Sequence, residues 1–317
     1  MGGMEPMPDM PPPPVEEACY RHPNVPTGVH CTRCNRPICP DCMIPAPVGH
    51  HCPTCVEEAR REFRKGPGRR IAVANAKATS VTKALLGIIV AVYVLEVANG
   101  GAGSLVNGPS AAKLYDLGGS AGVGIVNGFA SGGVAAGQYW RLFTAMFLHV
   151  GLLHLAFNGY ALWIIGQFVE QELGRARFVA IYFVTGLFAS AASYAFQPNP
   201  FTVGVGASGA IVGIFGAFIA FNWRRRHTAL GAARFRSALL ILVLNAVLNF
   251  GLANSIDWRA HLGGLVSGLV AGFAAEGFGR SRDDRLVFVL GCAALVGVTV
   301  GLVVWRTAQL KAQFPGL

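Results

Sequence analysis

Long apolar runs separated by short basic connections fill the chain from residue 84 onward. A helix needs about 20 mostly apolar residues to cross a hydrocarbon core of about 30 Å, and seven runs approach that length. The pattern therefore predicts an all-α polytopic membrane protein. The seven helices are expected at residues 84–100, 147–169, 178–196, 207–223, 237–253, 259–276 and 286–305.

The composition agrees with a membrane protein. The 317 residues are 53% hydrophobic and 13% charged, and the mean hydropathy is +0.47, unlike ordinary soluble domains. The formal net charge of +10 would suit a nucleic-acid binder, but the basic residues cluster between the apolar runs. We interpret them as topology signals and expect no nucleic-acid partner.

These basic residues predict the orientation, because Lys and Arg are retained on the cytoplasmic side. The connections 57–83, 170–177, 224–236 and 277–285 hold 18 of them. The opposite connections and the C-terminal tail hold five: Lys113, Arg141, Arg259, Arg306 and Lys311. We therefore expect a multi-pass protein of the cell membrane with a cytoplasmic N-terminus and an outer C-terminal tail.

The long, Gly-rich connection 101–146 is expected in or near the outer interface. Tyr139 and Trp140 suit an interfacial aromatic belt, and Arg141 could reach lipid head groups. The Trp140-Arg141 pair is interpreted as a folding and interface anchor without a chemical role.

Composition further divides the chain into segments. Residues 1–18 are Pro-rich and acidic and are expected to be disordered. They precede a cysteine-rich module at 19–56, a basic linker at 57–83, the transmembrane domain at 84–305 and a tail at 306–317.

Four polar residues inside the apolar runs need a reason, because polar groups at membrane depth are costly. They are His154, Asn158, Ser208 and His261, all in the outer half of their spans. His154 and Asn158 are one helical turn apart and share a face. Small residues line the fourth and sixth spans, and such faces let helices approach closely. If these faces meet, Ser208 comes within reach of His261. The small residues are Gly209, Gly213, Gly216 and Ala217 in the fourth span, and Ala260, Gly264, Gly268 and Gly272 in the sixth.

Residues 84–305 resemble the rhomboid family of intramembrane serine proteases. The resemblance rests on Trp140-Arg141, His149, the run from His154 to Asn158, Gly166-QFV-Glu170, Gly206-Ala207-Ser208-Gly209 and Ala260-His261-LGG, in this order. It implies a six-helix core followed by a seventh C-terminal helix. It also implies that His154 and Asn158 are the oxyanion residues and that catalysis needs no cofactor.

The residues allow serine-protease chemistry that opens to the extracytoplasmic side. A serine hydroxyl needs an adjacent base, and His261 is the candidate general base and acid for Ser208. Asp257 is expected to cap the sixth helix rather than contact the imidazole. Where the family often has an aromatic residue one turn after the serine, this chain has Val212, and Phe215 is a possible substitute.

The leading hypothesis is an intramembrane endopeptidase that cleaves single-pass membrane proteins near the outer ends of their transmembrane segments. A second is a catalytically silent relative that binds transmembrane clients. A third, a transporter with a polar pathway, is disfavoured because the polar residues lie in the outer half only. Glu170 is expected to bind nearby backbone at the inner end of the second span, and Glu96 to have a buried partner.

The N-terminal module resembles B-box or RING-like cross-braced fingers. Four close Cys/His pairs are what two tetrahedral zinc sites need. A disulfide framework is disfavoured because the segment is expected in a reducing compartment. We expect two structural zinc ions and a cytoplasmic protein partner; a sequential pairing of the ligands stays open. Cross-braced ligands would be Cys19, His22, Cys39 and Cys42 in one site, and Cys31, Cys34, Cys52 and Cys55 in the other.

Overall fold

The computed structural model describes residues 17–65, 79–101, 103–126, 129–130, 132–251, 257–276 and 282–317. The chain forms two compact units, Met1–Ala74 and Asn75–Leu317, which are considered separately below. Most of the N-terminal segment expected to be disordered, and residues 66–78 of the expected linker, lie outside the described residues.

The first unit is built around its cysteines. Six of them and Ile38 are buried together as its core, so little apolar surface stabilises it. Helix α1 continues nine residues past the expected module boundary at 56, so the start of the predicted linker is helical. The elements are β1 (Ala18–Cys19), β2 (His22–Pro26), η1 (Pro40–Cys42), β3 (Ile44–Pro45), β4 (His50–His51) and α1 (Pro53–Lys65), with β1–β2 and β3–β4 antiparallel.

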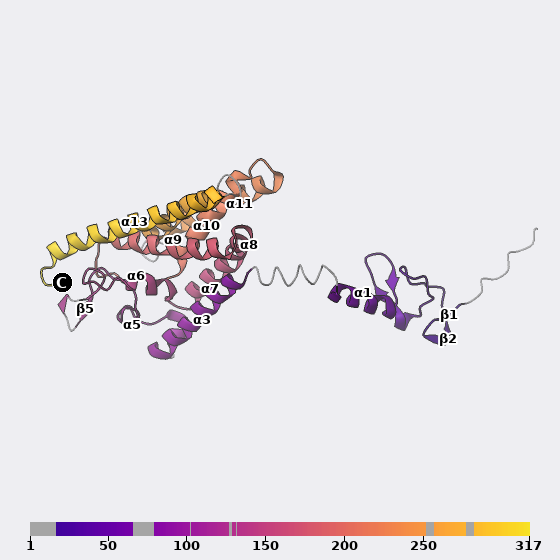
Figure 1. The fold of residues 1–317 in the computed structure, drawn as a ribbon. Helices are drawn as coiled ribbons and strands as arrows, with labels where there is room; N and C mark the ends of the chain where they lie inside the picture. The colour runs from indigo at the N-terminus through magenta and orange to yellow at the C-terminus, as the bar shows by residue number, and fades with distance from the viewer. Residues whose placement is uncertain are drawn as a thin grey trace, which may run out of the picture. The chain divides into compact units, whose positions relative to one another are not determined.

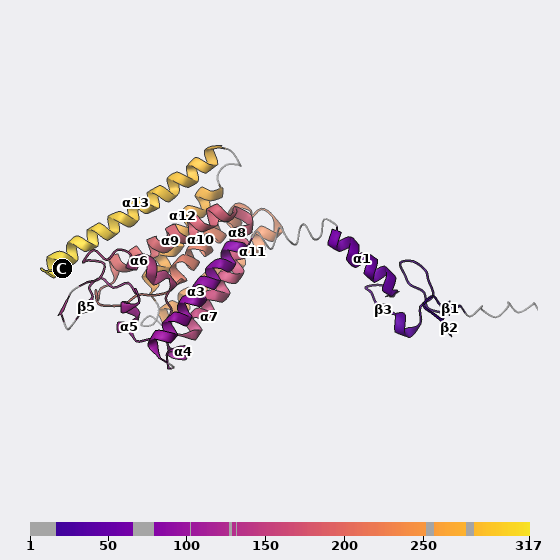
Figure 2. The ribbon, with the colours of Figure 1, turned by 60° about the horizontal axis from the view of Figure 1, so that its bottom comes forward.

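The second unit is helical, and a helix occupies most of each of the seven ranges predicted from the apolar runs (Figures 1 and 2). Between the first two long helices lie short helices and one antiparallel hairpin. The elements are α3 (Ser80–Gly100), α4 (Ser104–Asn107), α5 (Ala111–Asp116), β5 (Ile125–Val126), β6 (Phe129–Ala130), α6 (Arg141–Thr144), η2 (Ala145–Phe147), α7 (Leu152–Ala161), η3 (Leu162–Gly166), α8 (Gln167–Leu173), α9 (Arg175–Phe196), α10 (Ser208–Arg224), α11 (Ala229–Gly251), α12 (Trp258–Glu276) and α13 (Arg282–Gln313).

Four helical segments in the described part of the chain are long and apolar enough to cross a membrane: Ser80–Gly100, Leu152–Leu173, Arg175–Phe196 and Asp284–Gln313. Helix α10 is apolar and shorter. Together these helices make the chain a multi-pass membrane protein, as predicted. The core of the unit lies where α9, α10 and α12 pack together, and α13 runs along α9 (Figure 2).

The second span begins later than predicted. The apolar run predicts a helix from residue 147, but α7 starts at Leu152. Gly151, directly before it, has a φ of +95°, which is not a helical conformation. A π-helical turn, η3, lies in its middle and shifts the register between α7 and α8. Residues before and after this turn therefore do not continue one helical face at the usual spacing.

Candidate active site and metal centres

Ser208 is the first residue of α10. Two residues earlier, at Gly206, the backbone lies close to the segment that carries Ala145. The Gly206 N–H donates to the Ala145 carbonyl at 2.8 Å, and its φ is +134°. A Cβ at Gly206 would lie 2.8 Å from Cε1 of His154 and 3.6 Å from Oγ of Ser208. The imidazole of His154 and the hydroxyl of Ser208 thus flank the same point.

Helices α10 and α12 pack through their small residues, as the sequence predicted. A Cβ at Gly264 would lie 2.2 Å from the Gly209 carbonyl oxygen, and one at Gly268 would lie 2.0 Å from that of Gly213. At the start of both helices, a Cβ at Gly209 would be 3.8 Å from the Ala260 carbonyl. The turn that carries Ser208 therefore lies beside the turn that carries His261.

The proton on His154 follows from its hydrogen bonding. The Val150 N–H donates to Nδ1 of His154 at 3.3 Å, so the neutral ring carries its proton on Nε2. The Cε1 and Nε2 edge is the edge that faces Gly206, with Nε2 3.1 Å from a Cβ there. His154 thus presents an N–H donor toward the side of Ser208. Val150 carries no signal in the sequence, because it acts through its backbone.

Asn158 lies one turn beyond His154 on α7 and is buried. Its Nδ2 has no hydrogen-bond partner within the described residues. An unsatisfied buried amide costs free energy, so this N–H group is available to donate to a bound ligand. His149 is also fully buried, and its ring centroid lies 5.2 Å from that of His154. His149 is one of the residues that carry the family resemblance.

Asp257 caps α12, as expected. Its Oδ1 accepts from the N–H groups of Arg259 at 3.1 Å and Ala260 at 3.3 Å. Its Oδ2 accepts a short hydrogen bond from the Ser193 hydroxyl on α9. Sequence reasoning missed Ser193, although a serine within an apolar helix is itself a signal that it has a polar partner. The cap therefore ties the start of α12 to α9.

Phe215 packs with Ile219 and Ala238 in a cluster between α10 and α11. Its ring stacks on Phe218, with centroids 6.2 Å apart. The cluster also includes Leu265 and Leu269 of α12, so the aromatic residue considered as support for His261 packs among residues of α10, α11 and α12.

Both buried glutamates have the roles that the sequence suggested. Glu170 accepts from the backbone N–H groups of Val81 at 2.9 Å and Thr82 at 2.8 Å, so it caps the start of α3. Glu96 accepts from the His149 N–H at 3.2 and 3.1 Å. These carboxylates hold α3 against both ends of the second span.

Arg141 anchors the fold, but the prediction that it could reach lipid head groups is wrong. Its side chain is 5% exposed, because its guanidinium donates to the Gly119 carbonyl at 3.0 Å and Gln138 at 2.6 Å and lies over the Tyr115 ring. Its neighbour Trp140 is 51% exposed, as an interfacial aromatic residue would be.

The cysteine module brings its ligands together in the cross-braced order. Cys19, His22, Cys39 and Cys42 form one cluster and Cys31, Cys34, Cys52 and Cys55 the other, each with all its ligand atoms within 4.8 Å.

The spacing within each cluster suits tetrahedral zinc. The sulfurs of Cys34 and Cys52 are 3.7 Å apart, close to the edge of about 3.8 Å that follows from zinc–sulfur bonds of about 2.3 Å. His22 points Nδ1 at Cys39, 3.1 Å away. The residues therefore fit two zinc ions, and the sequential pairing is excluded for this arrangement.

Backbone N–H groups favour the thiolate form of one cysteine in each cluster, Cys19 and Cys31, whereas burial raises the pKa of Cys34, Cys42 and Cys55. Burial would raise the pKa of the Cys31 thiol, but N–H donors led by Cys52 lower this pKa to about 6. The Cys52 N–H lies 3.2 Å from the Cys31 sulfur. Such donors satisfy the extra lone pairs of a metal-bound thiolate.

Fold and geometry together define the class: a polytopic helical membrane protein in which a serine turn, two histidines and a buried asparagine gather near the ends of packed helices. Residues 136–277 match the family model of the rhomboid domain. The rhomboid protease GluP of Bacillus subtilis (strain 168) is 37% identical over 53% of this chain.

For two further relatives, the matched segment spans about two thirds of the relative's own length. YdcA, from the same Bacillus subtilis strain, is 35% identical over 44% of this chain and 69% of its own. RHOMBOID-like protein 6, mitochondrial, of Arabidopsis thaliana is 33% identical over 62% of this chain and 67% of its own. The chain belongs to the rhomboid family, as the resemblance implied, although the matched segment spans only 32% of GluP.

Proposed function

We propose that this protein is an intramembrane serine endopeptidase that hydrolyses peptide bonds near the outer ends of transmembrane segments. The observation that carries the proposal is the packing of Gly209 against Gly264 and Ala260, which brings the N-terminal parts of α10 and α12 together. Ser208 is the proposed nucleophile and His261 its base. Membership of a family with named proteases supports the same reaction class.

In the proposed reaction, His261 accepts the Ser208 proton during attack on the scissile carbonyl and then returns a proton to the leaving amine. The tetrahedral oxyanion accepts hydrogen bonds from Nε2 of His154 and Nδ2 of Asn158. The Nε2 edge that faces Gly206 and the unpartnered Asn158 amide support these roles. Loss of one such donor typically costs about 100- to 1000-fold in rate.

The proposed substrates are single-pass membrane proteins. A peptide bond within a helix is shielded by its hydrogen bonds, so a substrate helix must unwind near its outer end. The imbalance of 18 basic residues against five supports a cytoplasmic N-terminus and a site that opens outward. The zinc-binding unit is then cytoplasmic, and we propose that it binds two zinc ions and a protein partner there.

A fluorophosphonate probe tests the proposed nucleophile. Detergent-solubilised wild-type protein is expected to be labelled, while Ser208→Ala abolishes labelling and His261→Ala slows it strongly. Ser193→Ala is the matched control, because Ser193 is a second serine bonded near the start of α12. Labelling that persists in Ser208→Ala would refute the assignment. A folded wild-type protein that is never labelled would instead favour a silent relative that binds transmembrane clients.

A further inference from the structure

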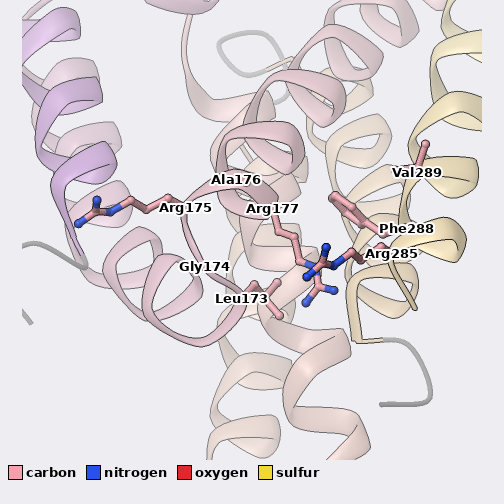
Figure 3. Close-up of a pocket in the computed structure, with 8 residues that line it drawn as sticks. All are labelled: Leu173, Gly174, Arg175, Ala176, Arg177, Arg285, Phe288 and Val289. Atoms are coloured by element: carbon pink, nitrogen blue, oxygen red, sulfur yellow. The ribbon is translucent and has the colours of Figure 1, made fainter. Parts of the chain in front are cut away.

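A cavity of about 650 Å³ lies where α8 ends and where α9 and α13 begin. It has an apolar wall and a basic rim, as Figure 3 shows. The wall is made by Leu173, Phe288 and Val289, and the rim by Arg175, Arg177 and Arg285.

Two of the arginines face the same space. Arg177 and Arg285 both line the cavity, and in Figure 3 their guanidinium groups are drawn in the same part of the view, whereas Arg175 points the other way. Arg175 has its Nε 3.9 Å from the Glu170 carboxylate. The guanidinium carbon of Arg177 lies 5.9 Å from the centroid of the Phe288 ring.

No carboxylate in the described part of the chain neutralises this pair of charges. Within the described ranges, neither Arg177 nor Arg285 forms an ion pair with a carboxylate. Two like charges held close repel each other, and an anion between them reverses the sign of that interaction. Arginine pairs also match the geometry of a phosphate, which can accept two parallel hydrogen bonds from each fork.

The apolar wall distinguishes a lipid from a soluble anion. Phe288 is buried in the wall of the cavity, while Val289 is 59% exposed on an apolar helix long enough to span the membrane. The cavity thus joins a basic rim at the helix ends to an apolar surface that runs along α13. A phospholipid has the same two parts in the same order.

We propose that this cavity binds the phosphate head group of an anionic phospholipid, with Arg177 and Arg285 on the phosphate and an acyl chain along Phe288 and Val289. Basic pockets between transmembrane helices on the cytoplasmic side are suited to such head groups. The cavity lies on the side that holds the 18 basic residues. Lipid binding here does not depend on the proposed proteolysis.

Native mass spectrometry of the full chain in neutral detergent tests the site. Wild-type protein is expected to retain phosphatidylglycerol in preference to phosphatidylcholine. Arg177→Gln/Arg285→Gln should weaken phosphatidylglycerol binding on the order of tenfold or more, about 1.4 kcal/mol. The matched control, Arg226→Gln/Arg236→Gln, removes the same charge from the same side and should bind as wild type does.

Three outcomes would overturn the proposal. They are equal loss of binding in the two double variants, no loss in either, or full displacement of phosphatidylglycerol by inorganic phosphate, which would indicate a site for a free anion. Should the Gln pair fail to fold, Arg177→Lys/Arg285→Lys keeps both charges and removes the forked geometry. It is expected to bind phosphatidylglycerol more weakly than wild type, and unchanged affinity would contradict the assignment.

Discussion

Gly206 lies between the side chains of His154 and Ser208. The proposed chemistry needs these two groups on either side of the scissile carbonyl. Its φ of +134° is open to glycine and strained for other residues. A side chain there would also meet the His154 ring. The backbone at this residue therefore leaves room for both the donor edge of His154 and the Ser208 hydroxyl.

Gly206→Ala is expected to slow fluorophosphonate labelling of Ser208 by roughly 100-fold, because a displacement of about 1 Å at a reacting group can cost that much. The rate of probe incorporation measures the effect. Gly137→Ala is the matched control, since Gly137 has a similar positive φ of +89° and no atom within 4 Å of its Cβ position. Equal rates in the two variants would show that the space at Gly206 is unimportant.

At this scale the sequence points to the candidate chemical groups more readily than to the groups that position them. Ser208, His261, His154 and Asn158 stand out because polar groups are rare at membrane depth. The Val150 N–H that orients His154 is a backbone group, and no side-chain pattern reveals it. Arg141 was misjudged because the carbonyls that bury it, such as that of Gly119, are set by the folding of a loop.

At the scale of elements, the contact between α10 and α12 determines whether Ser208 and His261 can meet. Gly213 and Gly268 bring the two backbones so close that a Cβ at Gly268 would lie 2.0 Å from the Gly213 carbonyl oxygen. In lipid such close packing, rather than hydrophobic burial, holds helices together. The contact continues to Gly272 against Ala217.

Gly268→Ala should destabilise the transmembrane unit by about 1–3 kcal/mol, because the added methyl group forces the helices apart. Thermal unfolding in detergent, followed by helicity, measures the change. Gly297→Ala, on α13 where no atom lies within 4 Å of the Cβ position, should leave the unfolding temperature unchanged. A Gly268→Ala protein as stable as wild type would mean that α10 and α12 are farther apart.

The helices themselves followed from the sequence, because apolar runs and small-residue faces are local patterns. Their ends followed less well. The second span begins at Leu152 because Gly151 and the Glu96 contact to His149 shape the preceding loop. Gly151 packs against the backbone of residues 106–108, and Glu96 lies on α3, so both depend on tertiary packing. The π turn at Leu162–Gly166 has no signature in the apolar pattern.

At the scale of the whole molecule, the two units are stabilised by different physics. The membrane unit has an extended apolar core, whereas the small unit buries Ile38 and cysteines. Close Cys/His pairs made its two clusters predictable, but their cross-braced order was one of two possibilities in the sequence. The three-dimensional arrangement groups Cys19 with Cys42 and Cys31 with Cys55.

Metal analysis of the purified full chain should return about two zinc ions. Cys31→Ser is expected to lose at least one of them, because three ligands hold zinc less well than four. Cys292→Ser is the control, since Cys292 lies in α13 outside both clusters, and it should retain two. A small unit that folds without any metal would contradict the zinc assignment, because metal binding is expected to supply most of its folding free energy.

The most direct measurement is the distance between the Ser208 hydroxyl and the His261 imidazole in an experimental structure of the wild-type protein in lipid. We expect Oγ and a ring nitrogen within hydrogen-bond reach, about 2.6 to 3.2 Å, beside a water-accessible hollow. Side chains held in separate surroundings, with lipid or packed protein between them, would contradict a serine protease built on this pair.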